Sequence, residues 1–199
     1  MPLKLDALLK VPRAVVLDLE ATCCDDKSFP RSEMEVIEFG AVVVDMRTKQ
    51  VIQEYDEFVR PEIHPVLTPF CTKLTSITQD DMAIANPFVD VFTRFLAECW
   101  DDVSILVTWG DFDVHILSEE FGLHRAEFET GGISGFPFPE ERHLNAKQAV
   151  ADALQIRRRG VSAMLTHLGL PFEGRHHRGI DDSKNIWKIV RIALVKKEH

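Results

Sequence analysis

Runs of apolar residues in the first part of the chain have the length and spacing of β-strands. The segment 14–20 is apolar on both faces until its end, which is typical of a strand at the centre of a sheet. Two more strands are predicted over 36–44 and 51–59, and the polar residues 47–50 join them as a hairpin. The chain therefore opens with three strands, preceded by a short N-terminal arm, residues 1–12, that a proline closes.

After an irregular segment at 61–69, the apolar spacing becomes that of helices and buried strands. Asn86 is the predicted N-cap of a helix and Pro87 its first residue, followed by one apolar stripe over 88–99. The glycine-rich stretch 130–135 is expected to be a flexible loop. The remaining predicted elements are a strand over 103–108 and helices over 111–121, 145–154, 161–168 and 182–195.

This order of elements indicates one α/β domain over 13–199, with a central mixed sheet of about five strands flanked by helices. A length of 199 residues allows one well-buried core, and a second full domain would be crowded. No apolar run is long enough to span a membrane, and the N-terminus lacks the layout of a signal peptide. The four cysteines show no C-x-x-C spacing, which argues against zinc. We therefore predict a cytoplasmic protein with reduced thiols and no membrane partner.

Two acids stand at the end of the first strand. Residues two apart in a strand point to the same face, so Asp18 and Glu20 form a carboxylate pair on an otherwise apolar element. Burying two acids without a counter-charge is costly, and a bound cation would relieve that cost. The alternative is a strand that simply becomes solvated at its end. The pair alone does not decide between the two.

Three later residues extend the pattern. Asp182 stands on the apolar face of the last helix, His177 lies five residues earlier in a basic loop, and Asp113 follows the strand 103–108. Taken singly, the two acids are equally explained by the helix dipole, which stabilises acids in a first turn, and neighbouring Asp111 or Asp181 would serve as well. A single loop histidine is usually a surface residue.

As a set, these residues predict a metal site. If the acids converge at one edge of the sheet, four carboxylates would hold two hard divalent cations, with magnesium or manganese favoured by oxygen ligands. Two such cations can activate a water and stabilise the leaving oxygen of an in-line phosphodiester cleavage. A histidine that titrates near neutral pH is a suitable base for that water.

The same residues resemble the motifs of the DEDDh superfamily of 3′→5′ exonucleases, named for four acids and a histidine. Asp18–Cys23, which reads D-L-E-A-T-C, resembles the first motif in the form found in the Eri-type branch, whose members include histone-mRNA and RNAi-suppressing exonucleases. Phe112–Leu117 matches the second motif and favours Asp113 over Asp111 as the ligand, and His177–Ile186 matches the third. The resemblance extends from about residue 13 to residue 195.

The resemblance implies an RNase-H-like fold and release of nucleoside 5′-monophosphates from the 3′ end of single-stranded RNA or DNA. It implies that His177 is the general base and that two Mg²⁺ or Mn²⁺ ions are bound, with Asp18 shared between them. The implied metal ligands are Asp18, Glu20, Asp113 and Asp182. The implied substrate contacts are Glu20, the backbone at Ala21 and Thr22, the loop with Leu74 and Ile77, and His177. Ser76 stands where the family often has glycine.

The D-x-E-A-T-C form favours RNA, and a DNA proofreading or repair exonuclease is the alternative enzyme. An inactive nucleic-acid-binding module would be expected to lack a metal ligand or the base, and all five positions are intact. The net charge of −9 predicts weak, salt-sensitive binding confined to the cleft.

Other residues near these motifs allow two interpretations each. Arg157–Arg159 would hold substrate phosphate or form a solvated turn, with equal support. Phe136 and Phe138 could stack on bases, although loop aromatics more often pin their own loop. Trp109 is expected to be a packing residue.

Overall fold

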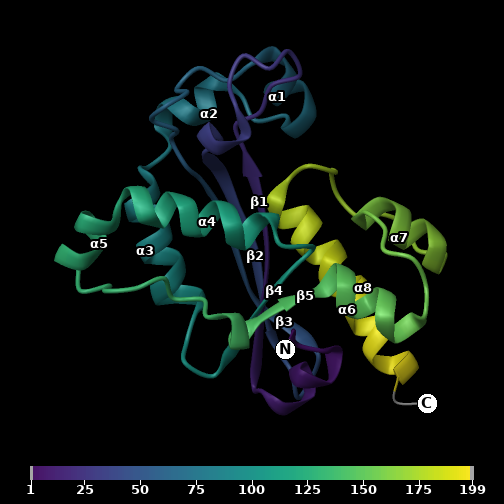
Figure 1. The fold of residues 1–199 in the computed structure, drawn as a ribbon. Helices are drawn as coiled ribbons and strands as arrows, with labels where there is room; N and C mark the ends of the chain where they lie inside the picture. The colour runs from purple at the N-terminus through teal and green to yellow at the C-terminus, as the bar shows by residue number, and fades with distance from the viewer. Residues whose placement is uncertain (1, 198–199) are drawn as a thin grey trace.

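The computed structural model describes residues 2–197 and contains one five-stranded mixed sheet (Figure 1). The strand order is β3-β2-β1-β4-β5, in which β1 pairs antiparallel with β2 and parallel with β4. The strands are β1 (Arg13–Ala21), β2 (Val36–Asp45), β3 (Gln50–Phe58), β4 (Ser104–Thr108) and β5 (His143–Asn145). The predicted α/β class and mixed sheet of about five strands are confirmed, and β5 is the strand whose place the sequence pattern did not reveal.

Helices cover both faces of the sheet, with α3–α5 on one side and α6–α8 on the other (Figure 1). The α-helices are α1 (Pro69–Thr75), α2 (Gln79–Ile84), α3 (Phe88–Cys99), α4 (Phe112–Leu123), α5 (Arg125–Thr130), α6 (Ala146–Leu154), α7 (Val161–Leu168) and α8 (Gly179–Lys197). Short 3-10 helices occur at η1 (Leu5–Lys10), η2 (Arg31–Glu33) and η3 (Glu140–Arg142). In the described residues no helix has both the length and the apolar character needed to cross a bilayer.

Strand β1 is buried on both faces, as its continuous apolar pattern predicted. Val15 and Leu17 pack into the core formed with α3 and α4, whereas Ala14 and Val16 pack into the core formed with α6–α8. Side chains alternate along a strand, so the even-numbered positions of β1 all face α8. This alternation directs Asp18 and Glu20 toward α8 before any side-chain detail is considered.

Helix α8 lies very close to the sheet at its first turn. A Cβ atom on Gly40 of β2 would overlap the backbone of Gly179 and Ile180, so only glycine fits there. The hydroxyl of Ser183, which is fully buried, donates to the Gly40 carbonyl at 2.5 Å. The close approach fixes where the first residues of α8 stand relative to β1 and β2.

Several boundaries differ from the sequence pattern. Helix α3 begins at Phe88 with Pro87 as its N-cap and no side-chain cap, so the predicted capping role of Asn86 was wrong. Asn86 instead forms a parallel bridge with Val59, which holds its backbone in an extended conformation that joins the sheet region. Helix α8 begins at Gly179, one turn before the predicted start.

The two segments expected to be irregular or arm-like both pack on the core. In the arm, Leu5 and Leu8 of η1 are buried against α6 and α8. In the glycine-rich region, helix α5 ends at Thr130 and the following residues form an irregular loop. Phe138 is only 4% exposed and meets Trp100 edge-on, with ring centroids 4.8 Å apart. This aromatic pins its loop, which is the interpretation that the sequence favoured.

Candidate active site

Five residues from three parts of the fold line one cleft at the carboxyl end of β1. Asp18 and Glu20 come from β1, Asp113 from the first turn of α4, and Asp182 with His177 from the start of α8 and the loop before it. Because β1 and β4 are parallel, their carboxyl ends lie at the same edge of the sheet, which places α4 beside β1. The cleft has a volume of about 450 Å³. Its other lining residues are Leu19, Trp109, Phe112, Gly160, Val161, Ser162, Ala163 and His176.

Three of the four predicted metal ligands form a tight group. One carboxylate oxygen each from Asp18, Glu20 and Asp182 lies within 4.8 Å of the others. Asp113 lines the same cleft, and its Oδ1 accepts a hydrogen bond from the Leu19 backbone N–H at 3.1 Å. This bond holds the α4 carboxylate against the end of β1, next to the group of three.

The clustering of acids strongly perturbs their ionisation. Burial raises the pKa of Asp18 well above its ordinary value, and the charges of Asp113, Asp182 and Glu20 raise it further. Burial, with Asp182 and Glu38 as neighbours, raises the pKa of Glu20 to about 9. Burial also raises the pKa of Asp113 to about 7, although the Leu19 N–H opposes this change. Without a cation, the protein therefore holds acids that resist ionisation together.

The donor set fits a hard divalent cation. The grouped ligand atoms are carboxylate oxygens, and in the described residues neither Asp18 nor Glu20 receives a hydrogen bond from the protein to its carboxylate. A buried acid without a donor or counter-ion is costly, and a divalent cation supplies the missing positive charge. Oxygen-only coordination is the preference of Mg²⁺ and Mn²⁺ rather than of zinc or copper.

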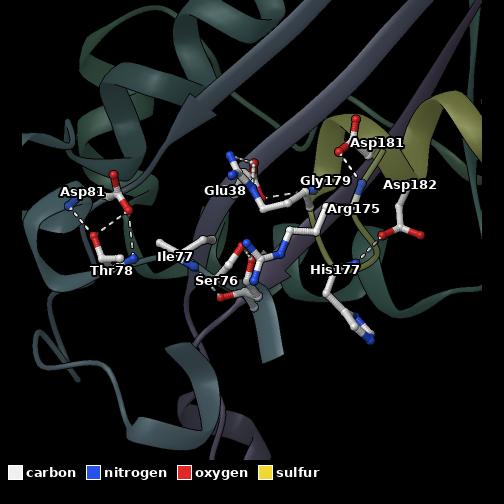
Figure 2. Close-up of polar contacts among 12 residues, drawn as sticks. Glu38, Ser76, Ile77, Thr78, Asp81, Arg175, His177, Gly179, Asp181 and Asp182 are labelled. Carbon is white, nitrogen blue, oxygen red and sulfur yellow. Dashed lines mark hydrogen bonds and ion pairs between the residues drawn. The ribbon is translucent and has the colours of Figure 1, made fainter. Parts of the chain in front are cut away.

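His177 lies at the edge of the cleft, directly attached to one of these acids. Its backbone N–H donates to Asp182 Oδ2 at 2.7 Å, and Figure 2 shows its ring extending away from that contact. Its φ of 63° is in the left-handed region, which few non-glycine residues adopt. Burial, together with the charge of His176, lowers the pKa of His177, so its imidazole is neutral at neutral pH.

The residues expected to contact a nucleotide lie beside the same edge. Ala21 and Thr22 are buried, and Thr22 is bound through its N–H and its hydroxyl to the backbone of Glu35. Only the backbone of this segment therefore remains for a substrate. Leu74 is half-buried on α1.

Ile77 requires a correction. Its side chain is 0% exposed and packs with Ile37, Leu67 and Cys71 beneath the loop, so the expected direct contact with a base does not fit. Ser76, which precedes it, has a φ of 66°. That left-handed conformation explains why glycine is favoured at this position. Ile77 instead anchors the loop from below.

The sequence did not indicate that the first turn of α7 also lines the cleft. Trp109, at the end of β4, donates from its ring N–H to the Arg159 carbonyl at 2.9 Å. This bond ties the segment before α7 to the sheet edge, and Gly160–Ala163 then border the acids. Trp109 was expected only to pack, and it does both. The basic run 157–159 was the only local signal for this part of the cleft.

The fold and the site together define the class of this protein. The exonuclease family model RNase_T matches residues 15–190, and the chain therefore belongs to this family. The chain is 30% identical to 3'-5' exoribonuclease 1 of Homo sapiens, over 87% of this chain and 50% of the relative. It is 28% identical to 3'-5' exonuclease eri1 of Schizosaccharomyces pombe, over 89% of this chain and 66% of the relative. It thus spans about half to two thirds of the length of these two proteins.

Solved structures give the same answer. The chain resembles the nuclease domain of 3'hExo, a DEDDh family member bound to rAMP, with a TM-score of 0.79, 30% identity and 94% coverage of both chains. It also resembles a 3'-exonuclease in a structure of 3'-end recognition of a histone mRNA stem-loop, with a TM-score of 0.80 and 29% identity. That likeness covers 94% of this chain and 65% of the other. The predicted RNase-H-like fold and the resemblance to the Eri-type branch of the DEDDh superfamily are confirmed.

Proposed function

We propose that this chain hydrolyses single-stranded RNA from the 3′ end to nucleoside 5′-monophosphates, using divalent cations. The observation that carries the proposal is the group of three buried carboxylates within 4.8 Å of one another, with Asp113 and His177 on the same cleft. Family membership supports the reaction class, because the matching family is one of exonucleases.

Each of the five residues has a proposed role. Asp18, Glu20 and Asp182 would hold one Mg²⁺ or Mn²⁺ ion, and Asp18 and Asp113 would face a second. Such ions, when bound, supply activation of the attacking water and stabilisation of the leaving oxygen. His177 is neutral at neutral pH and would accept the proton of that water at a ring nitrogen.

The substrate contacts follow from the same geometry. The backbone of Glu20, Ala21 and Thr22, at the end of β1, would meet the terminal nucleotide. Leu74 would lie beside its base, while the buried Ile77 holds that loop in place. The hydrolytic cleft is small and bordered by α7 and the loop before α8, which favours a single flexible strand over a duplex.

Three observations favour RNA. Two relatives are named as a 3'-5' exoribonuclease and a 3'-5' exonuclease, and one similar structure contains rAMP. Another concerns recognition of the 3′ end of a histone mRNA stem-loop. DNA remains the alternative substrate, since the choice depends on contacts to the 2′-hydroxyl. We also propose a cytoplasmic location, which the four free cysteines support.

The proposal is tested by cleavage of 5′-labelled single-stranded RNA and DNA of matched sequence, with Mg²⁺, Mn²⁺ or a chelator. We expect a ladder that shortens from the 3′ end only with metal, and a higher rate on RNA. Absence of cleavage of both polymers by the folded, metal-binding protein would refute it. Equal or faster cleavage of DNA would overturn the RNA preference alone.

The roles of base and ligand are separated by two variants. His177→Ala is expected to slow cleavage while thermal stabilisation by Mn²⁺ stays as in the wild type, because no metal ligand is removed. Asp182→Ala is expected to lose both cleavage and the stabilisation. If Mn²⁺ stabilises His177→Ala as poorly as it does Asp182→Ala, the assignment of His177 as base is wrong.

A further inference from the structure

The loop from Glu173 to His177 is attached to α8 at every second residue. Asn185 Oδ1 accepts from the Glu173 N–H at 3.1 Å, Asp181 Oδ2 from the Arg175 N–H at 2.8 Å, and Asp182 Oδ2 from the His177 N–H at 2.7 Å. Figure 2 shows the last two of these contacts side by side at the start of α8. We call this segment, residues 173–177, the histidine loop.

Asn185 is the innermost attachment and is used completely. It is only 1% exposed, and its Nδ2 donates to the carbonyls of Glu173 at 2.7 Å and Asp181 at 2.8 Å. A buried amide is costly unless its donors and acceptor are bonded, and here all of its partners belong to the histidine loop or to α8 itself. The proposed reaction gives this buried polar residue no role.

Asp181 is the middle attachment, and the loop is shaped around its carboxylate. Gly174 has a φ of 82°, and a Cβ atom on Gly174 would overlap the carboxyl group of Asp181. The backbone therefore turns against the acid, and the Arg175 N–H closes the contact. Unlike Asp182, Asp181 is not part of the group of acids that could hold a metal ion.

The conformation of His177 needs this support. A residue with a side chain at a φ of 63° is held there only when its surroundings fix the backbone, at a typical cost of about 1–3 kcal/mol. The contact from Asp182 fixes the N–H of His177, and the contacts from Asp181 and Asn185 fix the two preceding alternate residues. The direction of the imidazole is therefore set by backbone contacts rather than by its own side chain.

We infer that Asp181 and Asn185 are positioning residues for His177, which they hold in the orientation needed to act as the base. This inference rests on the proposed function. It requires that loosening the histidine loop affects the chemical step through His177 and leaves metal binding intact. A misplacement of about 1 Å can cost about a hundred-fold in rate, so even partial loosening is measurable.

The experiment is a double-mutant cycle of Asp181→Ala and His177→Ala, measured as kcat and KM on single-stranded RNA. We expect Asp181→Ala to lower kcat by about ten-fold or more with KM nearly unchanged. In the His177→Ala background the same change should have less than about a two-fold effect, because residues that act as a unit are not additive. Asp181→Asn, which keeps an acceptor oxygen for the Arg175 N–H, should restore most of the activity.

The matched control is Asp45→Ala, which removes a carboxylate that accepts the Thr48 N–H at 2.7 Å in the turn at the other end of β2. It should leave kcat unchanged. Asn185→Ala should reproduce the effect of Asp181→Ala, and Mn²⁺ should stabilise both variants as it does the wild type. An unchanged kcat in Asp181→Ala, an equal loss in both backgrounds, or a loss of Mn²⁺ binding would each overturn the inference.

A structural measurement separates failure of the inference from failure of the proposed function. Amide exchange of Arg175 and His177 should be faster in Asp181→Ala than in the wild type, while the amides of β1 keep their protection. Unchanged exchange at both amides would overturn the inference even if no substrate is cleaved. Unchanged kcat in His177→Ala alone would instead refute the base assigned in the proposed function.

Discussion

Two buried glutamates face each other across β1 and β2, and their surroundings differ completely. Glu20 and Glu38 are register partners, so both point toward α8. Glu38 is 0% exposed, and its two oxygens accept from Arg178 Nε at 2.9 Å and from the Gly179 N–H at 3.0 Å. Glu20 is 8% exposed and meets only other acids, with no donor to its carboxylate in the described residues.

The difference shows what distinguishes a structural acid from a functional one. Glu38 has its own counter-ion and donors, and these oppose the rise in its pKa that burial causes. For Glu20 burial and neighbouring acids act in the same direction and raise the pKa to about 9. A buried acid whose charge the protein balances needs no ligand, whereas one that the protein leaves unbalanced indicates a cation site.

The largest effect is expected from Asp18→Ala, which removes the acid shared by both proposed metal positions. Several kcal/mol of transition-state stabilisation depend on the metal, so cleavage should fall by about a thousand-fold or more. Because one of the repelling acids is gone, the chelated variant should melt at the same temperature as the chelated wild type or higher. Cleavage of labelled RNA and thermal melting measure the two effects, and a variant that unfolds would contradict the second.

Glu38→Ala should show the opposite behaviour. It leaves Arg178 without its partner at the buried end of α8, and breaking such a pair typically costs about 3–5 kcal/mol in the free energy of unfolding. Denaturant unfolding with chelator present measures this cost. Glu57→Ala is the matched control, since the exposed pair Glu57–Arg94 should cost about 1 kcal/mol or less. Equal costs for the two variants would show that Glu38 is not structural.

The pH dependence of stability sharpens the same comparison. Glu20 and Asp113 have folded-state pKa values of about 9 and about 7, above the value of about 4 in an unfolded chain. Between about pH 4 and 9 the folded apo protein thus binds more protons, so its stability falls as pH rises through this window. Melting temperatures with chelator should decrease from pH 5 to pH 8.5.

Metal should flatten this dependence, because a bound cation favours the ionised acids. Mg²⁺ or Mn²⁺ is therefore expected to stabilise the protein most at pH 8.5 and least at pH 5. Glu120, whose pKa burial raises to about 8 outside the cleft, contributes to both curves, so the difference between them isolates the site. Parallel curves with metal and with chelator would contradict the prediction.

The smallest effect is expected at the basic run before α7. Arg157 and Arg158 are exposed and form no ion pair in the described part of the chain, while Trp109 holds the next residue at the cleft. If they meet substrate phosphates, Arg157→Ala with Arg158→Ala should raise KM for RNA and lower its salt dependence by about 0.7 for each phosphate no longer bound. Arg47→Ala, in the turn at the far end of the sheet, is the control. No change in KM would favour the solvated turn.

Much of this protein was determined by the sequence alone. The continuous apolar run of β1 required burial on both faces, and its even-numbered spacing required Asp18 and Glu20 to share one face. Alternation along a strand is a local property of the backbone, so it is readable without a partner. The five candidate residues were found in the same way, from motifs whose internal spacing is short.

The tertiary structure decided what depends on distant partners. Nothing near Ile77 in the sequence shows that Ile37 and Leu67 cover it, and nothing near Asn86 shows that Val59 holds it outside α3. The contrast between Glu20 and Glu38 depends on Arg178, which lies 140 residues from Glu38. Burial and charge balance are set by which segments meet in space, so a sequence read locally identifies the acids but not which of them the fold leaves without a counter-charge.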